Sequence, residues 1–127
     1  MRMILLAGML VAAATVSAAP KPPTPSTIAL HPSSDLRLGG WVLFEVTFPK
    51  SAEKFGPRIQ VLCYQDDVLV YGAAGQYFEP FKLGGAASIW VYDSPGPAHC
   101  VADLYYWSYR GEQKFNWLAS VEFDAAG

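Results

Sequence analysis

The chain has 127 residues, enough for one domain of ordinary size, and its formal net charge is −2 at pH 7. Lysine and arginine are not clustered anywhere along it. This argues against a nucleic-acid-binding protein, since such proteins normally present a basic patch. The hydrophobic content of 52% is raised by the first eighteen residues, which contain a continuous apolar run.

Residues 1–19 have the pattern of a secretory signal peptide. Arg2 precedes an apolar run over residues 3–14, and small residues suited to a signal peptidase follow up to Ala19. A membrane anchor is the alternative, but the run is shorter than the roughly 20 apolar residues that a span needs. We therefore expect cleavage at or next to Ala19 or Pro20. The loss of Arg2 would bring the formal net charge to −3. The mature protein is then expected to be secreted and extracellular, without a stable membrane span.

A proline-rich segment follows at residues 20–26, with four prolines in its first six positions. Such a composition favours an extended, polyproline-type linker without a packed core. The sequence is compatible with two interpretations of this segment, a tether and a merely disordered N-terminus. The predicted folded domain covers residues 27–124.

Within this domain, alternating apolar and polar residues between Gly and Pro turns predict short strands, and no segment has helical periodicity over eleven or more residues. Segment 76–83 carries Pro80, which suits an edge strand or a loop. Residues 72–75 are expected to break the strand that begins at Val68. Asp66-Asp67 is expected to form a tight hairpin turn. The predicted strands are 27–31, 41–48, 58–65, 68–71, 87–92, 98–109 and 114–123.

The two last strands are rich in aromatic residues, and their faces follow from the alternation of side chains along a strand. On the long strand, one face is expected to hold Cys100, Ala102, Leu104 and Tyr106, and the other Val101, Asp103, Tyr105, Trp107 and Tyr109. On the last strand, the expected inward residues are Phe115, Trp117, Ala119, Val121 and Phe123, and Leu118 is expected to face out.

The only two cysteines are Cys63 and Cys100, and both are expected to face inward. In an exported protein this pair predicts one disulfide, with two buried free thiols as the alternative. The bridge would close a loop of some 37 residues and stabilise the fold by roughly 4 kcal/mol on the loop-entropy model.

About seven antiparallel strands predict an all-β sandwich. The order of elements resembles an immunoglobulin-like or fibronectin-like sandwich, with residues 40–48, 58–65, 87–92, 98–109 and 114–123 in the places of strands B, C, E, F and G. Two departures separate the chain from antibody-type domains. The first cysteine stands on strand C instead of B, and Ala98 stands where that family has a tyrosine.

The chain also resembles small Ig-like proteins of actinobacteria and their phages. The stretches 58–66, 83–88, 96–100 and 118–124 carry this resemblance. Such proteins are similar to virion decoration or tail-associated modules that act by adhesion. The resemblance therefore implies a virion surface as one location, and it supplies no catalytic residues.

Residues for catalysis or metal binding are sparse. The chain lacks the serine-hydrolase, zinc-protease and phosphate-loop motifs. His31 and His99 are far apart, and a metal needs three or four convergent ligands. We therefore expect no enzyme, no metal and no cofactor. The acids that could converge are Glu45, Asp93, Asp103 and Glu122, and Asp103 is expected to pair with Arg58 instead.

The outward aromatic residues are the remaining functional signal. The expected ligand-binding residues are Tyr64, Tyr105, Trp107 and Tyr109, flanked by Leu118. An exposed aromatic face would bind a glycan or protein on a host surface, whereas a loop or segment 76–83 could cover the same residues as a second small core. The expected function is an exported, non-catalytic binding or adhesion module. The alternatives are a structural decoration or oligomerising subunit without a ligand, and a small secreted glycan-active enzyme; the oligomeric state stays open.

Overall fold

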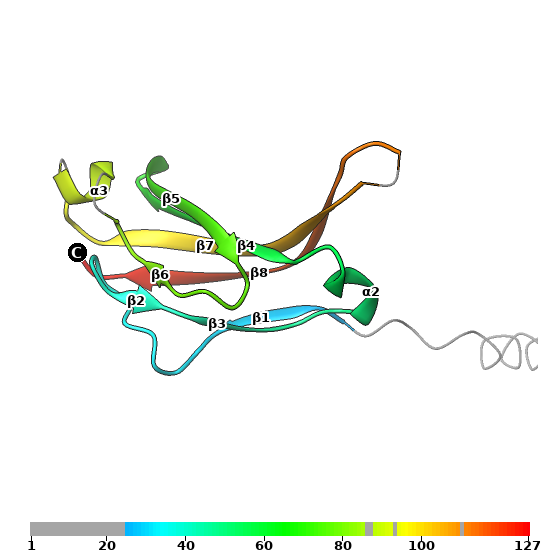
Figure 1. Cartoon of the computed structure of the whole chain (residues 1–127). Coiled ribbons are helices and arrows are strands. Elements are labelled where there is room, and N and C mark those ends of the chain that lie inside the picture. The colour runs from blue at the N-terminus through cyan, green and yellow to red at the C-terminus, as the bar shows by residue number, and fades with distance from the viewer. Residues whose placement is uncertain (1–24, 86–87, 93, 110) are drawn as a thin grey trace, which may run out of the picture.

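The computed structural model describes residues 25–127 except 86–87, 93 and 110, so the predicted signal peptide and residues 20–24 of the predicted linker lie outside it. Two layers of antiparallel strands face each other (Figure 1). One layer is a four-stranded sheet in the order β5-β4-β7-β8, and the other consists of the pairs β1-β3 and β2-β6. The predicted all-β sandwich is confirmed, with eight strands in the described part of the chain.

The strands are β1 (Thr27–Leu30), β2 (Trp41–Val42), β3 (Phe44–Thr47), β4 (Arg58–Gln65), β5 (Val68–Gln76), β6 (Phe81–Lys82), β7 (Ala98–Ser108) and β8 (Lys114–Ala125), with two single helical turns, α2 (Lys50–Glu53) and α3 (Ile89–Tyr92).

The core lies between the two layers and follows the predicted alternation. Ile59 and Val61 of β4 are fully buried, as is Leu104 of β7, and Val42 and Phe44 meet them from the other layer. Glu45 and Thr47 face solvent. Burying one face of each strand in this way is what stabilises a sheet with a solvated outer surface.

The hairpin from β4 to β5 turns at Asp66 and Asp67, as predicted, and both have positive φ angles of 48° and 67°. Both central residues of a type I′ turn need this left-handed backbone. Strand β5 then continues through residues 72–75, where we expected a break, because eight-residue β4 offers a pairing partner along its whole length. Segment 76–83, predicted as an edge strand or a loop, is mostly a turn and contains the short strand β6, which pairs with β2 in the opposite layer.

The predicted strand over residues 87–92 is wrong for its described part, because residues 89–92 form the helical turn α3. Trp90 is fully buried, and its indole N–H donates to the carbonyl of Gly96 at 2.6 Å. A buried indole needs an acceptor for its N–H. The helical turn places the Trp90 indole within reach of the Gly96 carbonyl, while Ile89 stays half exposed. Burial of one large side chain therefore outweighs the local β pattern.

A β-bulge separates the two ends of β8. Leu104 pairs with Ala119, but the next residue, Tyr105, pairs with Trp117, so Leu118 is the extra residue. Leu118 therefore packs against the core, and Phe115 and Trp117 turn to the outer face. The predicted orientation of these three side chains is wrong for this reason.

The predicted disulfide between Cys63 and Cys100 is confirmed. The two residues lie directly opposite each other on β4 and β7, with Cα atoms 4.0 Å apart. The bridge therefore links neighbouring strands of one sheet, whereas antibody-type domains link the two sheets.

Candidate functional site

The outer surface of the four-stranded sheet carries a cluster of large rings beside the β7–β8 hairpin. We call it the aromatic face, and it consists of Tyr105, Trp107, Phe115 and Trp117. Cross-strand register brings these residues together, since Tyr105 lies opposite Trp117 and Trp107 lies opposite Phe115. The Phe115 ring stacks on Tyr105 with centroids 5.2 Å apart, and it meets Trp107 edge-on at the same distance.

Exposure differs across the aromatic face. Trp117 is 58% exposed and Phe115 47%, whereas Trp107 is half-buried and Tyr105 is buried. Segment 76–83 does not cover this face, because β6 belongs to the other layer. Tyr105 therefore serves as the floor of the cluster, and Trp117 and Phe115 present the accessible rings.

Asp103 orients the most exposed ring. Its carboxylate accepts a hydrogen bond of 3.1 Å from the indole N–H of Trp117. The predicted ion pair between Asp103 and Arg58 is wrong: among the described residues no such pair forms, because Gln60 is the residue opposite Asp103 on β4. Arg58 lies opposite Tyr105 instead and borders the aromatic face.

The four ligand-binding residues predicted from the sequence do not all lie in one cluster. Tyr109 follows the end of β7 and is 64% exposed, so it extends the aromatic face toward the hairpin. Tyr64 pairs with His99, six residues from Tyr105 along β7, which places it about 20 Å away. Phe115 and Trp117 were missed because the bulge reverses their side; the adjacent apolar pair Trp117-Leu118 was the one available sign.

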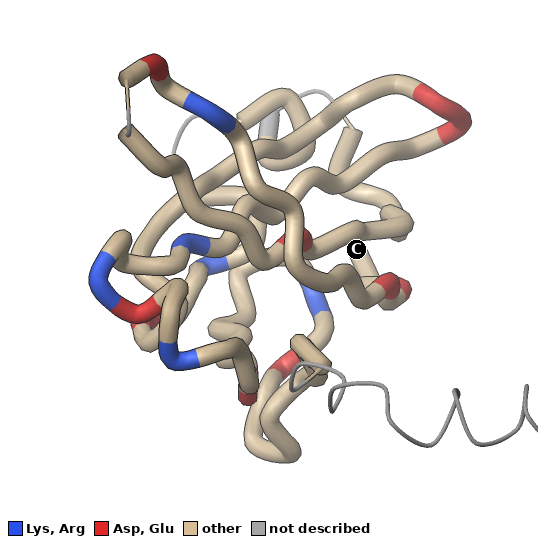
Figure 2. Tube along the Cα trace, turned by 90° about the vertical axis from the view of Figure 1, so that its right-hand side faces the viewer, with Lys and Arg blue, Asp and Glu red and all other residues tan. Residues whose placement is uncertain are grey.

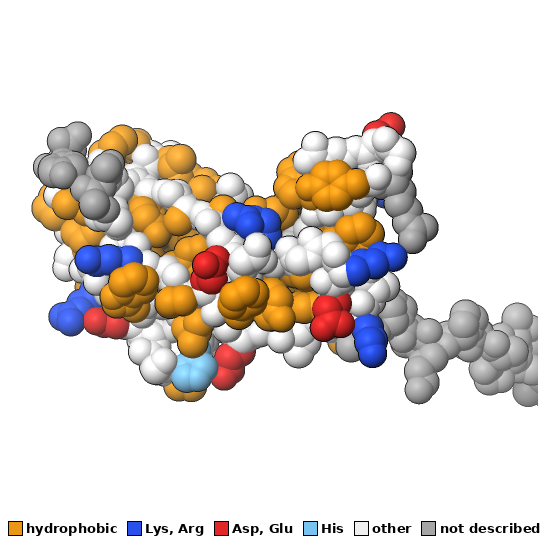
Figure 3. All heavy atoms as spheres, viewed as in Figure 1, with side chains coloured by type: hydrophobic (Ala, Val, Ile, Leu, Met, Phe, Trp, Pro, Cys, Tyr) orange, Lys and Arg blue, Asp and Glu red, His pale blue; other side chains and the backbone are white. Residues whose placement is uncertain are grey.

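The space-filling view agrees with this placement. Hydrophobic side chains gather on the projecting end of the β7–β8 hairpin, and the surface is hollowed between that end and the β4–β5 side of the molecule (Figure 3). Basic and acidic residues are scattered over the described chain without a long stripe of one sign (Figure 2). A neutral ligand therefore suits this surface better than a highly charged one.

A second, polar site lies at the other end of the same sheet, where Tyr64, His99 and Asp124 line a pocket of about 470 Å³. The His99 ring bonds Asp124 at 2.8 Å through Nδ1 and Glu122 at 2.6 Å through Nε2. The hydrogen bond to Asp124, then that to Glu122, raises the pKa of His99. Within the described residues no group of His, Cys, Asp and Glu side chains has the arrangement of a metal site.

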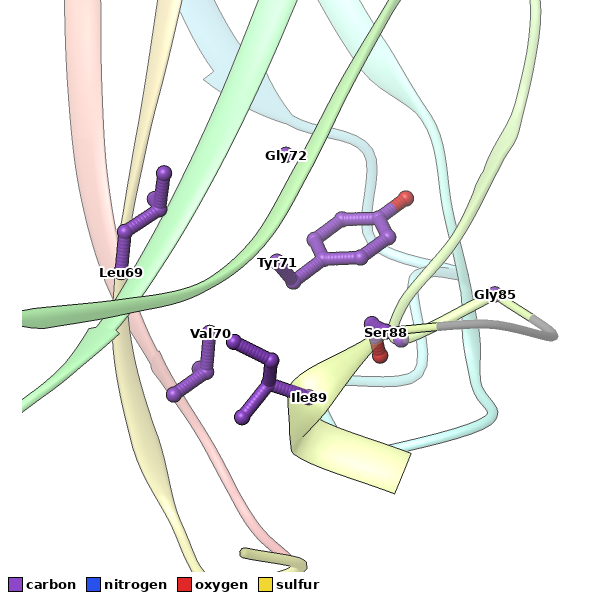
Figure 4. Close-up of a pocket in the computed structure, with 8 residues that line it drawn as sticks. Leu69, Val70, Tyr71, Gly72, Gly85, Ser88 and Ile89 are labelled. Atoms are coloured by element: carbon purple, nitrogen blue, oxygen red, sulfur yellow. The ribbon is translucent and has the colours of Figure 1, made fainter. Parts of the chain in front are cut away.

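An apolar groove of similar size runs between the start of β5 and α3 (Figure 4). Its walls include Leu69 and Tyr71 on the strand side and Gly85, Ser88 and Ile89 on the other. Tyr71 closes the floor, since its hydroxyl donates to the carbonyl of Lys82. Among the described residues that line this groove, no set of polar side chains converges to orient a small ligand, so we regard it as a packing surface.

None of the helices that the structure describes is long and apolar enough to cross a membrane. In comparisons with family models, with curated proteins and with solved structures, no match to this chain was found.

Proposed function

We propose that this chain is an exported, non-catalytic binding module that uses its aromatic face to hold a glycan on a host surface. The resemblance to Ig-like sandwiches, and to Ig-like proteins of actinobacteria and their phages, supports this class of function. Secretion and display on a virion are both compatible with it, and both rest on the same resemblance and on the predicted signal peptide.

The observation that carries the proposal is the state of Trp117. A large ring that is 58% exposed on a folded sheet loses the benefit of burial, and exposed apolar clusters usually mark a contact surface. Its N–H bond to Asp103 holds the indole in one orientation before any ligand arrives. Such preorganisation lowers the entropic cost of binding.

The chemistry around the ring favours a sugar over a protein partner. A pyranose presents C–H groups on one face and hydroxyls at its edge, and the C–H groups complement the negative face of an aromatic ring. Asp103 bonds the Trp117 indole, and Gln60 and Arg58 lie opposite Asp103 and Tyr105 on β4; these side chains are acceptors and donors for hydroxyl groups. A protein interface would place a larger apolar area at its centre.

The test compares two tryptophans with almost equal exposure. Trp41 is 56% exposed on β2, in the opposite layer, and serves as the control for Trp117. We expect Trp117→Ala to weaken binding to actinobacterial cells, or to their isolated wall polysaccharide, by roughly tenfold or more, the scale of one aromatic anchor. Trp41→Ala should bind as the wild type does, and both variants should stay folded.

Treatment of the cells separates the two classes of ligand. Periodate oxidation should abolish binding and protease treatment should leave it. Loss of binding after protease alone would show a protein receptor and contradict the glycan proposal. Undiminished binding of Trp117→Ala would reject the aromatic face itself.

A further inference from the structure

The aromatic face and the polar site lie at the two ends of one surface, the outer face of the four-stranded sheet. At one end Tyr64 lies opposite His99, and His99 lies opposite Asp124. At the other end Tyr105 lies opposite Trp117, six residues along β7 from His99, or about 20 Å. This outer face bends upward at the β4–β5 turn and at the β7–β8 hairpin (Figure 1), and the surface between them is hollowed (Figure 3).

Two cross-strand rows of side chains join these ends. The first consists of Leu62, Val101 and Glu122, and the second of Gln60, Asp103 and Ser120. All six side chains are exposed or half-buried. Strand β5 borders the rows with Gly72 and Ala74, whose small side chains keep the surface low there. We call the surface from Tyr64 through these two rows to Trp117 the outer track.

The polar end of the outer track is formed before any ligand arrives. The side-chain amide of Gln65 donates to the carbonyls of Ser94 at 2.8 Å and Gly96 at 3.0 Å, which fixes one wall of the pocket beside Tyr64. The ring of His99 is held from both sides by carboxylates of β8. A preformed pocket with an aromatic ring and several polar groups is typical of a ligand site.

We infer that a glycan chain of several linked sugar units lies along the outer track, with one unit against Trp117 and another against Tyr64. This inference rests on the proposed function and adds a second contact to it. A single sugar ring is much shorter than the distance between the two aromatic side chains, so only a chain reaches both. The rows between them supply hydrogen-bond donors and acceptors for the hydroxyl groups of the middle units.

The charges of the outer track favour a neutral chain. Among the described residues of the track and its border, the carboxylates of Asp103, Glu122 and Asp124 outnumber the basic side chains of Arg58 and His99. An anionic polysaccharide would be repelled by this balance, whereas a neutral one donates its hydroxyl groups to the carboxylates.

The test uses fragments of the wall polysaccharide, made by partial acid hydrolysis, freed of anionic material on an anion exchanger and sorted by size. In calorimetric titrations of the exported protein, the hexasaccharide should bind at least about tenfold more tightly than the disaccharide, because it gains a second aromatic contact. Tyr64→Ala should reduce this ratio to the few-fold gain that a longer chain has at a single site. Tyr64→Phe, which keeps the ring, and Trp41→Ala, in the opposite layer, should retain the ratio.

The two proposals fail in different ways. Trp117→Ala should weaken binding of both fragments, because the disaccharide also uses that end. An undiminished ratio in Tyr64→Ala, or binding of the whole polysaccharide but of no neutral fragment, would overturn the outer track and leave the aromatic face as the site. Undiminished binding by Trp117→Ala would reject the aromatic face, and the outer track with it.

The wild-type protein provides a second measurement, in case Tyr64→Ala fails to fold. His99 lies beside Tyr64, whereas the other histidine, His31, lies 3.8 Å from Glu45 in the opposite layer. In NMR spectra, with each fragment at its own dissociation constant, the imidazole signals of His99 should shift with the hexasaccharide and stay in place with the disaccharide. Those of His31 should move with neither fragment. Any other pattern would contradict a chain that spans the outer track.

Discussion

His99 is an exposed residue whose two ring nitrogens are both hydrogen-bonded. Both ring nitrogens bond to carboxylates of the neighbouring strand β8, Asp124 and Glu122, although all three side chains are largely exposed. These bonds favour the protonated ring and raise its pKa above the usual value of about 6.5. The pair of bonds ties the start of β7 to the end of β8.

The raised pKa of His99 gives stability a defined pH dependence. The contribution is complete below about pH 6.5, the pKa in the unfolded chain, and is lost as the pH rises through the higher pKa of the folded state. We expect the urea midpoint to fall across this window. In Glu122→Gln/Asp124→Asn the fall should shrink, and an NMR titration of His99 should show a lower pKa than in the wild type. An unchanged pKa in the double variant would contradict the assignment.

At the scale of the element, α3 shows how one side chain can decide a local conformation. Ile89-Trp90-Val91 is compatible with a strand by composition, yet the segment forms a helical turn over the end of the core. Trp90 is fully buried, while Ile89 is half exposed. The buried indole and its bond to Gly96 therefore hold the turn, and half-exposed Ile89 contributes only slightly.

Substitution of the buried indole should separate these contributions. Trp90→Ala should lower the free energy of unfolding by about 3–5 kcal/mol, because it opens a cavity in the core. Ile89→Ala, on the same turn, should cost less than about 1 kcal/mol. Chemical denaturation of both variants gives the comparison. Equal losses for the two would mean that the turn is held by its whole apolar surface.

At the scale of the whole molecule, the Cys63–Cys100 bridge joins β4 and β7, the two central strands of the larger sheet. It closes a loop of 37 residues that contains β5, β6 and α3. Cross-linking restricts the unfolded chain, and the effect grows with the length of the loop. The bridge therefore restricts the unfolded chain over the segment that forms β5, β6 and α3.

Removal of the bridge should be costly for the whole fold. We expect Cys63→Ala/Cys100→Ala to lower the free energy of unfolding by about 2–5 kcal/mol. Urea unfolding of the double variant beside the oxidised wild type measures this loss. A difference below about 0.5 kcal/mol would show that packing between the layers holds these strands without help from the bridge.

Much of the fold could be predicted because strand periodicity is local. An unbroken alternation decides which residues share a face, so the inward side of β4, the inward side of β7 and the pairing of Cys63 with Cys100 were all predictable. The Asp66-Asp67 turn was predictable too, because these residue types tolerate the left-handed backbone.

The candidate site was decided by tertiary structure. Apart from the adjacent apolar pair Trp117-Leu118, the sequence of β8 has no sign of a bulge, and the pairing with β7 is what shows the bulge that turns Trp117 outward. Likewise, the exposed or covered state of Tyr105 depends on Phe115 reaching it from another strand. Alternation in the sequence predicts which side chains share a face where a strand has no bulge, as on β7. Register between strands and the cover over each face come from contacts distant in sequence, which no local pattern encodes.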